Sequence, residues 1–423
     1  MDLRSLPAGL NPEEHCRERR ARVENETVTD LSLLHTDAGR IGQADEKNCE
    51  QMIGSVPLPV GIAGPLAITF SSGEKSNVFL PLATTEAALV ASVNRGCKVL
   101  STSGGVSIKS VYHGMSRSLV FKPKNKKGQT FTSAIKTLEQ EWKRIGEATS
   151  AHLKILRYDL DESDGYTFLT IFCDTSEAMG MNMTTIAAQA IGNFLAQELD
   201  ADLITIAANV DSDKKPSSRT HDRGRGYEVT AKADIPSSII ANVLKTTPQQ
   251  LCAVADAKLR VGSALAGAIG SNLHVANVIA ALYLATGQDG AHVVEGSLAD
   301  TKIVPLWTSP PPPSPPPVGE ERPLIPLPPP GEGLGMGKKL AGIRIEVRLP
   351  ALLVGVRGGG TALPAQNQCL SLILKPQRGM LPALRRPQQL AETIGAAVLA
   401  GELSLLAAQA TQTLASSHKK LAR

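Results

Sequence analysis

The stretch that decides the fold contains four strand-forming segments: SLVFKP (118–123), HLKILRYDL (152–160), YTFLTIFCD (166–174) and LITIAANV (203–210). The turn DESDG separates the second segment from the third, which predicts a β-hairpin. An amphipathic helix is predicted around 131–147, and a second helix from Met183 to about Asp200. The resulting β-α-β-β-α-β order is typical of the ferredoxin-like split arrangement. We therefore expect residues 119–205 to form a compact α+β unit.

Helices are predicted on both sides of this unit. The charged segment NPEEHCRERRARVEN begins with Asn11, a plausible N-cap. From Gly54, glycine, proline and β-branched residues predict loop and strand, followed by a helix near 84–97. Residues 235–300 have a mostly helical, alanine-rich pattern, and 387–416 is another helical region rich in alanine and leucine. Their small side chains would permit close helix packing.

A proline-rich segment interrupts this pattern. Residues 309–330 (SPPPPSPPPVGEERPLIPLPPP) hold 12 of the 28 prolines. Because proline lacks a backbone N–H and fixes φ, such a run can neither pair in a sheet nor continue a helix. We expect an exposed excursion of polyproline II type. It is either a docking tract for an SH3- or WW-type partner or a solvated insertion without a role.

Composition excludes several classes of protein. The 423 residues are 42% hydrophobic and 20% charged, which is typical of a globular protein with a real core. A formal charge of +4 and an aromatic content of 3% argue against binding nucleic acid. The six cysteines include no C-x-x-C pair, which favours reduced thiols over disulfides or zinc. The N-terminus is polar, and no stretch approaches the roughly 18 apolar residues that span a bilayer. We expect a soluble, cytoplasmic protein without membrane attachment.

Four ionisable residues could each take part in catalysis or have an ordinary structural role. Glu86 follows two threonines in the apolar segment LPLATTEAAL. Burial there would raise its pKa and keep it protonated as a donor, but it could equally balance a helix dipole. Taken alone, Lys214 in NVDSDKKPSS, Asp289 in TGQDG and His418 in SSHKKLAR are typical of a solvated turn, a helix cap and a mobile terminus.

Two glycine-containing segments could approach a ligand closely. SEAMGMNMTT (176–185) places Gly180 and Asn182 at a predicted helix start, where a phosphate would be favoured. Its methionines could equally fill a core. RGGGTALP (357–364) is suited to backbone contact with a cofactor, or is a flexible turn.

Eight segments, taken in order, resemble the signature blocks of one family. They are PLPVGIAGPL (57–66), ATTEAALVASVNRGC (83–97), SEAMGMNM (176–183), SDKKP (212–216), VGSALAGAIG (261–270), HVANVIAALYLATGQD (274–289), GGGTALPAQNQCL (358–370) and LAGELSLLAAQA (399–410). They look like hydroxymethylglutaryl-CoA reductase, and resemble its class I branch more than class II. The likeness covers about 50–297 and 345–418, and several blocks are long enough to be specific.

The resemblance implies an α+β fold. A large mixed helical and β domain surrounds a long central helix, and a ferredoxin-like nucleotide-binding domain is inserted into it. We expect an N-terminal helical region at 1–54, a large substrate- and CoA-binding domain at 55–118 and 206–423, and a small NADP-binding domain at 119–205. Within the large domain, 300–343 departs from the family as an atypical proline-rich insertion where a strand-forming stretch is usual.

The resemblance also implies a reaction. Hydroxymethylglutaryl-CoA is reduced to mevalonate and coenzyme A with two NADPH, and no metal ion takes part. Glu86 is then the acid at the substrate carbonyl, and Lys214 stabilises the oxyanion. Asp289 hydrogen-bonds both of them. His418 protonates the departing thiolate once a C-terminal flap has closed.

Further contacts are carried over from the family by position. Those to the substrate carboxylate are Arg117, Asp213 and Lys215, with Asn277 nearby. Those to coenzyme A are Ser92, Asn94, Arg95, Lys98, Val243, Leu244 and Lys245. Those to the nucleotide are Ser150, Ala151, His152, Glu177, Ala178, Met179, Gly180, Met181, Asn182, Met183, Thr184 and Thr185. Because the family's sites form between two subunits, a homodimer or homotetramer is implied.

Two alternatives remain open at this point. The chain could be a catalytically weakened relative that serves binding or regulation through its proline-rich segment. A different acyl-CoA or aldehyde oxidoreductase has less support, because the chain lacks a G-x-G-x-x-G fingerprint and a convincing cysteine nucleophile.

Overall fold

One mixed sheet organises the molecule. The computed structural model describes residues 3, 5–27, 30–124, 128–308, 340–375 and 383–412, and the structural statements below concern these residues. Within them the sheet has nine strands, with the order β2-β1-β3-β7-β9-β8 along its main path. Neighbours on this path are antiparallel except β1 and β3, which are parallel. The strands are β1 (Val60–Thr69), β2 (Lys75–Ala83), β3 (Val106–Pro123), β7 (Gly226–Pro236), β8 (Asp300–Trp307) and β9 (Leu340–Leu352).

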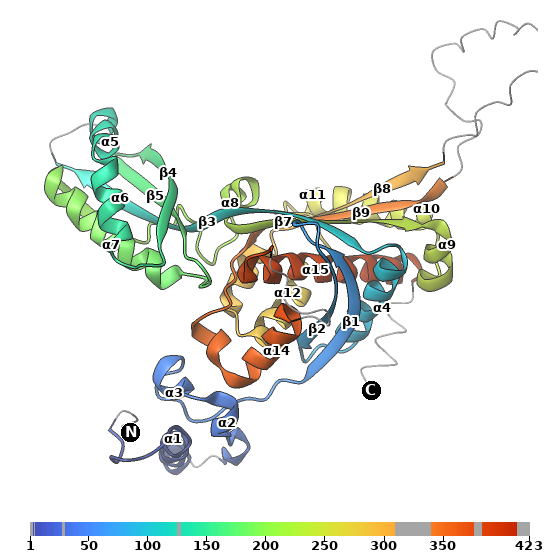
Figure 1. Ribbon diagram of the computed structural model, residues 1–423, viewed down its shortest axis with the longest axis horizontal. Coiled ribbons are helices and arrows are strands. Elements are labelled where there is room, and N and C mark those ends of the chain that lie inside the picture. The colour runs from blue at the N-terminus through green and yellow to red at the C-terminus, as the bar shows by residue number, and fades with distance from the viewer. Residues whose placement is uncertain are drawn as a thin grey trace, which may run out of the picture.

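The long strand β3 belongs to two parts of the sheet (Figure 1). Its first half pairs with β1 and β7, and its second half, from Met115, pairs with β5 and β6. The predicted boundary between residues 118 and 119 therefore falls inside a continuous strand. The remaining strands are β4 (Lys154–Ser163), β5 (Tyr166–Asp174) and β6 (Ala201–Thr205).

The β-α-β-β-α-β order predicted for 119–205 is present, with the strand order β6-β3-β5-β4. Its helices are α5 (Gly128–Thr137), α6 (Glu139–Glu147) and α7 (Met181–Glu198). One long helix was expected over 131–147, but the chain breaks at Leu138. The carbonyl of Ile135 instead accepts a hydrogen bond of 3.0 Å from Trp142 Nε1. Trp142 thereby enters the separate apolar core of this part of the molecule.

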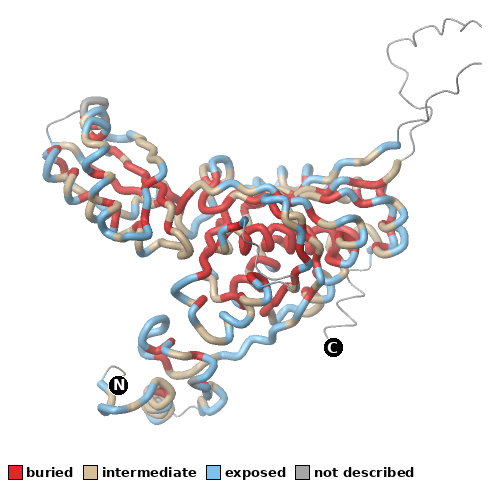
Figure 2. The backbone as a smooth tube through the Cα atoms, viewed as in Figure 1, coloured by how far each residue is buried: buried red, intermediate tan, exposed pale blue. Residues whose placement is uncertain are grey.

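The largest core surrounds α15 (Arg386–Ala410), the long central helix that the resemblance implied (Figure 2). It packs against β7, β9, α4 (Leu89–Thr102) and α12 (Val275–Thr286). Small residues make this packing possible. A Cβ added to Gly96 of α4 would lie 2.0 Å from the carbonyl oxygen of Ala400, so the two helix backbones are in direct contact.

The expectation that no apolar stretch reaches membrane-spanning length is wrong on length and composition. Helix α15 has 25 residues and a mean hydropathy of 1.5 over its most apolar window. However, 94% of that window is buried inside the protein. Because its apolar surface is already covered on nearly all sides, α15 is explained as a core helix.

The other helical elements cover the sheet or connect its strands. They are α1 (Pro12–Thr27), η1 (Ser32–Leu34), α2 (Ala38–Ile41), α3 (Ala44–Lys47), α8 (Ser218–Arg223), α9 (Ser237–Ile239), η2 (Ile240–Leu244), α10 (Pro248–Ala255), η3 (Asp256–Gly262), α11 (Ser263–Leu265), η4 (Gly290–His292), α13 (Val293–Gly296), η5 (Gly359–Ala362) and α14 (Pro364–Leu374). The helix expected near 84–97 begins later, because β2 runs to Ala83 and Ala88 has a left-handed backbone (φ +71°).

The N-terminal region forms a small unit beside α14 (Figure 1). As predicted, Asn11 caps its first helix: Asn11 Oδ1 accepts from the Glu14 amide, and Glu14 Oε2 accepts from the Asn11 amide, each at 2.9 Å. Cys16 and Met52 lie in its small apolar core, against which Leu363 packs. This contact brings α3 near the glycine-rich segment that follows β9.

Strands β8 and β9 flank the proline-rich segment. They pair antiparallel from Asp300 with Arg348 to Trp307 with Leu340. Residues 300–307 and 340–343, the two ends of the stretch predicted to be an atypical insertion, are therefore regular strand. Residues 309–339, and with them the predicted polyproline tract, lie outside the described residues.

Candidate active site

Lys214 and Asp289 form an ion pair of 2.8 Å between Nζ and Oδ2. Lys214 lies in the loop after β6, and Asp289 follows α12 as the N-cap of η4. The two side chains are 42% and 36% exposed, so a ligand can reach both of them. The family resemblance predicted this contact, and the fold makes it by bringing together two connecting segments that lie far apart in the sequence.

The charge of Asp289 is fixed by its surroundings. Burial raises its pKa, but Lys214, the amide of Ala291 and His292 together hold it below the ordinary value. Asp289 is therefore a carboxylate at neutral pH. It accepts hydrogen bonds from Lys214 Nζ and from the Ala291 amide, the latter at 3.0 Å.

The loop that carries Lys214 is held in an uncommon backbone conformation. Asn209, Ser212 and Lys214 all have positive φ values, of 64°, 54° and 57°. Non-glycine residues adopt this conformation at a cost of about 1–2 kcal/mol each, so surrounding contacts must maintain it. One such contact is the Lys214 amide, which donates to Glu295 Oε1 at 2.6 Å.

A buried arginine lies behind this loop. Arg225 is 1% exposed, and its Nη1 lies 3.1 Å from Asp213 Oδ1 and 2.9 Å from Glu295 Oε1. Its Nε donates to Ser116 Oγ at 2.9 Å. Sequence analysis missed Arg225, Glu295 and His292, since nothing in HDRGRG or AHVVEG marks them as partners of the lysine loop.

Three of the four predicted substrate contacts lie beside Lys214. Arg117 Nη1 is 3.5 Å from Asp211 Oδ2 and 3.4 Å from Asp213 Oδ2, and Lys215 Nζ donates to the Asp213 carbonyl at 3.0 Å. Burial raises the pKa of Asp213, but Arg225 and Arg117 hold it below the ordinary value. We call Arg117, Asp213, Lys214, Lys215 and Asp289 the lysine cluster.

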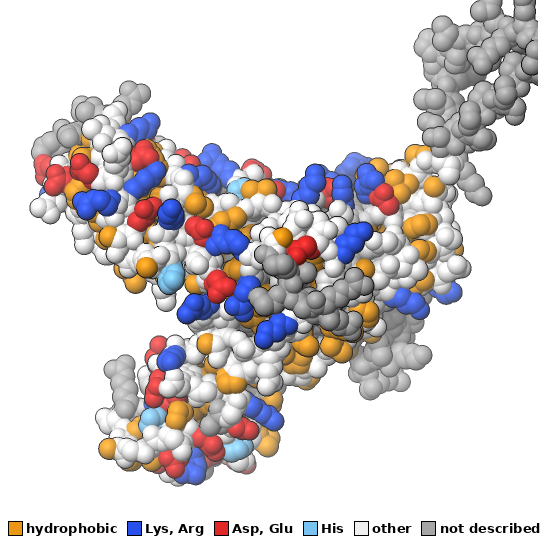
Figure 3. Space-filling model, viewed as in Figure 1, with side chains coloured by type: hydrophobic (Ala, Val, Ile, Leu, Met, Phe, Trp, Pro, Cys, Tyr) orange, Lys and Arg blue, Asp and Glu red, His pale blue; other side chains and the backbone are white. Residues whose placement is uncertain are grey.

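Two members of the lysine cluster, Lys214 and Asp289, line a cavity of about 720 Å³. Its walls come from the N-terminal unit, the start of α7, the segment after α12 and the glycine-rich segment after β9. They include Lys47, Asn48, Ala178, Met179, Gly180, Met181, Asn182, Met183, Lys214, Gln288, Asp289, Arg357, Gly358, Gly359, Gly360 and Thr361. Figure 3 shows a hollow between the part of the molecule formed by residues 119–205 and the N-terminal unit, with charged side chains at the inner end of the hollow.

Glycines shape the wall of this cavity. Gly180 precedes α7 with φ +92°, where a Cβ would collide with Thr175 at 2.3 Å. Gly358 and Gly359 face open space, with nothing within 4 Å of an added Cβ. The backbone at Gly358 and Gly359 is thus open to a ligand, whereas glycine is needed at 180 for close packing against Thr175. The first amides of α7 lack helical partners.

Not all of the predicted nucleotide residues line the cavity. Thr184 is buried, and its hydroxyl donates back to Met181 O at 2.9 Å. Thr185 accepts from Arg117 Nε at 3.0 Å, and Glu177 lies 3.4 Å from Arg386. Ser150, Ala151 and His152 form a turn before β4, at the sheet end where Lys154 pairs with Asp174.

Glu86 lies elsewhere and does not line this cavity. The expectation that it is buried is wrong: it is exposed in the loop between β2 and α4, and its amide donates to Thr84 Oγ1 at 2.9 Å. The apolar residues before it point into the core from β2, whereas the loop itself turns to the surface. Within a single chain, Glu86 is therefore not the buried acid that the sequence suggested.

The predicted CoA contacts gather on or beside α4. Ser92 Oγ donates to Ser404 Oγ of α15 at 2.9 Å, and Arg95 Nη2 donates to the Ser404 carbonyl at 2.6 Å. Asn94 and Lys98 are exposed. In the adjoining η2, Leu244 is 2% exposed and belongs to the core, so its prediction as a CoA contact is wrong for the side chain.

The remaining predicted contacts lie in or beside η2 and in α12. Val243 is half-buried and Lys245 exposed, beside α4. Asn277 is exposed in the first turn of α12, whereas Asp289 follows its last turn. At about 1.5 Å per residue the two lie roughly 15 Å apart along the helix. We call Glu86, Ser92, Asn94, Arg95, Lys98 and Asn277 the α4 group. His418 lies outside the described residues.

Comparisons with known proteins identify the family of this chain. The model of the hydroxymethylglutaryl-coenzyme A reductase family matches residues 15–423. The chain belongs to this family. The prediction made from the eight sequence segments is thereby confirmed.

Relatives of known sequence match along nearly the whole chain. The 3-hydroxy-3-methylglutaryl-coenzyme A reductase of Haloferax volcanii is 36% identical over 424 residues, covering 100% of this chain and 96% of the relative. That of Aeropyrum pernix is 36% identical over 416 residues, covering 98% and 90%. The reductase chain described here is thus similar in extent to archaeal members.

A solved structure shares the fold. The class II 3-hydroxy-3-methylglutaryl-CoA reductase from Streptococcus pneumoniae, bound to NADPH in open conformations, superposes with a TM-score of 0.62 at 17% identity. The alignment covers 93% of this chain and 96% of that chain. The mixed α/β architecture is therefore that of the reductase family.

One group of potential metal ligands comes together among the described residues, and its surroundings do not suit a metal ion. Asp213, His292 and Glu295 come within 4.8 Å of one another. However, the guanidinium of Arg225 lies at hydrogen-bond distance from both carboxylates, and already supplies their positive partner. A cation placed there would be repelled by Arg225.

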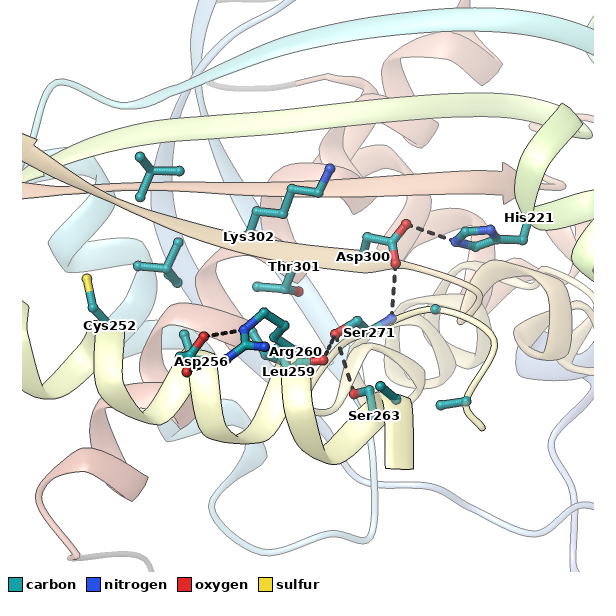
Figure 4. Close-up of a pocket in the computed structure, with 16 residues that line it drawn as sticks. His221, Cys252, Asp256, Leu259, Arg260, Ser263, Ser271, Asp300, Thr301 and Lys302 are labelled. Carbon is teal, nitrogen blue, oxygen red and sulfur yellow. Dashed lines mark hydrogen bonds and ion pairs between the residues drawn. The ribbon is translucent and has the colours of Figure 1, made fainter. Parts of the chain in front are cut away.

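A second cavity of about 670 Å³ lies between β8 and η3 (Figure 4). At one end His221 Nε2 lies 2.8 Å from Asp300 Oδ2, and at the other Arg260 pairs with Asp256. Among the described residues, none of those predicted from the sequence as site residues lines it. It is separate from the lysine cluster.

Proposed function

We propose that this reductase converts hydroxymethylglutaryl-CoA to mevalonate and coenzyme A with NADPH as reductant, at the lysine cluster. Family membership over residues 15–423 makes it a hydroxymethylglutaryl-CoA reductase of the mevalonate pathway. The observation that carries the assignment of the site is the Lys214–Asp289 ion pair at the wall of a glycine-lined cavity.

The cavity is suited to a nicotinamide nucleotide. Its volume of about 720 Å³ lies within the range of small-molecule sites. Gly180, Asn182 and the 358–360 glycines would hold the nucleotide through backbone contacts, and Lys47 and Arg357 offer positive charge for phosphates. When bound, NADPH supplies the hydride that no side chain can deliver.

Lys214 would act on the substrate oxygen. Its ammonium, aimed at the cavity, stabilises the negative charge that develops on the carbonyl oxygen during reduction. Asp289 orients Lys214 through the 2.8 Å contact. Because its own pKa is lowered, Asp289 acts as an acceptor and not as a proton donor.

The substrate carboxylate would be bound next to Lys214. Arg117 and Lys215 are cations at the same edge, and the long contacts of Arg117 to two aspartates leave its guanidinium able to take a better partner. Asp213 holds the position of Arg117 and offers an acceptor for a hydroxyl group. His418 remains the proposed proton donor to the thiolate of coenzyme A.

We further infer a homodimer or homotetramer with sites shared between subunits. Within one chain, Glu86 and Asn277 do not reach the cavity that holds Lys214 and Asp289. A second copy could bring its α4 group to that cavity. Exposed apolar side chains offer surface for such contacts. They include Val56, Leu58, Val60, Ile62, Val261, Leu265, Val304 and Trp307.

The remaining proposals concern organisation. We propose that residues 119–205 act as an inserted NADP-binding domain of ferredoxin-like type, that 55–118 with 206–423 binds substrate and coenzyme A, and that 1–54 is a helical appendage. We also propose a class I, cytoplasmic enzyme. The NADPH-binding class II relative supports the cofactor, because it shares the fold.

A steady-state assay tests the function. Purified protein given hydroxymethylglutaryl-CoA should oxidise NADPH, followed by its absorbance, and should release free thiol and mevalonate. Running NADH in parallel measures the cofactor preference. Folded protein that oxidises neither nucleotide in the presence of the substrate would contradict the proposal and favour a weakened relative with a binding role.

A further inference from the structure

Glu295 of α13 is completely buried, and three groups converge on its Oε1. The Lys214 amide lies at 2.6 Å, Arg225 Nη1 at 2.9 Å and His292 Nδ1 at 3.3 Å. A buried carboxylate is strongly destabilising unless charged or polar partners surround it. All three partners lie in or beside the loop that carries Lys214. The position of this loop and the burial of Glu295 therefore depend on each other.

The contact with Lys214 acts on the main chain. Lys214 has φ +57°, and its direction of approach to Asp289 depends on that backbone conformation. A hydrogen bond from a backbone amide to a carboxylate is among the stronger hydrogen bonds in proteins, and it can offset the cost of the left-handed conformation. Glu295 therefore supplies enough energy to hold Lys214 in a conformation that the residue alone would avoid.

His292 is fully buried between Glu295 and Asp289: its Nδ1 faces Glu295, and its Nε2 lies 3.6 Å from Asp289 Oδ2. That distance is too long for a hydrogen bond, and Nε2 has no hydrogen-bond partner among the described residues. Arg225 balances the negative charge from the other side through Glu295 and Asp213. Glu295 therefore supports the Lys214–Asp289 pair through the Lys214 amide, although it does not itself line the cavity.

We propose that Glu295 is a positioning residue for the reduction, which holds the Lys214 backbone through the Lys214 amide. The inference rests on the proposed role of Lys214 and Asp289 at the reacting centre. Glu295 touches neither substrate nor cofactor. Its removal should leave binding nearly intact and should slow the chemical step, because the ammonium would no longer be fixed where charge develops.

Other buried glutamates show what a merely structural role looks like. Glu392 of α15 is also fully buried, and accepts from the Ser71 amide at 3.0 Å and from Ser110 Oγ at 2.6 Å. Its partners join the β1–β2 turn and β3, away from the lysine cluster. Glu392 is therefore a matched control for the loss of a buried carboxylate.

The test compares Glu295→Ala, Glu295→Gln and Glu295→Asp with Glu392→Gln in the full-length protein. Each variant is assayed for kcat, for KM with hydroxymethylglutaryl-CoA and NADPH, and for melting temperature, at a temperature where it is folded. We expect Glu295→Ala to lower kcat about 100-fold with KM changed less than about threefold, since a displacement of about 1 Å has such an effect. Glu295→Gln keeps an oxygen for the Lys214 amide and should recover part of kcat.

Glu295→Asp keeps the charge for Arg225 but is too short to reach the same amide, so it should fold and still lose kcat. Glu392→Gln should lower the melting temperature and leave kcat within about twofold of wild type. The inference is overturned if the Glu295 variants lower kcat no more than Glu392→Gln, or if they change KM alone. If Glu295→Ala does not fold, the Gln and Asp variants decide.

Wild type and Lys214→Ala are assayed beside them. An inactive wild type contradicts the proposed function itself. An active wild type, an inactive Lys214→Ala and fully active Glu295 variants contradict only the positioning role.

Discussion

In the lysine cluster the charged side chains face opposite charges within the same chain, whereas the α4 group leaves its charges open. Lys214 pairs with Asp289, and Arg117 lies against two aspartates. Glu86 and Lys98, by contrast, are exposed, and Arg95 is bound to the neutral Ser404. One half of the candidate site is preorganised by its own chain, while the other half presents groups for a ligand or a second subunit.

Catalysis should be more sensitive to mutations in the lysine cluster than to mutations in the α4 group. Lys214→Ala removes the cation that faces the developing oxyanion, and we expect kcat to fall by about 1000-fold. The measurement is NADPH oxidation with hydroxymethylglutaryl-CoA. Lys302→Ala removes an exposed lysine of β8 and serves as the control, with activity expected near wild type. Turnover of Lys214→Ala at the wild-type rate would remove the lysine cluster from the mechanism.

Mixing two inactive chains would test whether the two halves meet between subunits. Glu86→Gln and Lys214→Ala homo-oligomers should each be nearly inactive. In mixed dimers one of the two sites would combine an intact Glu86 with an intact Lys214, so random mixing should restore about a quarter of wild-type activity. Co-expression with two affinity tags isolates the mixed species. If the purified mixture stays as inactive as either parent, the two groups act within one chain.

Mutations in the α4 group should affect substrate binding more than the chemical step. Arg95→Ala removes the guanidinium that joins α4 to Ser404 of α15, and leaves the predicted CoA surface less ordered. We expect KM for hydroxymethylglutaryl-CoA to rise about tenfold, with kcat little changed. Lys75→Ala, an exposed lysine at the start of β2, is the control. A fall in kcat at constant KM would instead place Arg95 with the reacting groups.

The smallest expected effect concerns stability and pH. The pKa of Asp213 is held below its ordinary value of 3.8 by Arg225 and Arg117, although burial raises it. The ionised form is thus favoured in the folded state, so its stabilising contribution is present above that ordinary value and is lost as pH falls through the folded pKa.

Asp213→Asn should therefore lower the melting temperature by a few degrees at pH 7, and the difference should shrink below about pH 4. Thermal unfolding of both proteins across this range provides the measurement. Asp164→Asn, in the exposed β4–β5 turn, should show no such pH dependence. A difference that stays constant down to pH 3 would mean that Asp213 acts by packing and not by charge.

Local patterns were sufficient to predict many elements of the fold. The hairpin of β4 and β5, the Asn11 cap and the apolar α15 follow from turn residues, capping chemistry and composition. Predictions failed where tertiary contacts compete with local preference. The helix expected over 131–147 is broken at Leu138 to bury Trp142, and Glu86 is on the surface despite its apolar neighbours.

The sequence by itself determined the order of the elements, the family and the candidate site residues, because these depend on short segments whose chemistry is local. Only the tertiary structure decided which groups meet. Glu295 lies 81 residues from Lys214, and Arg225 reaches across 70 residues to Glu295. Charge pairing depends on distance in a medium of low dielectric constant, and periodicity in sequence carries no information about that distance. The lysine cluster was therefore recognisable as a set of residues but not as a network.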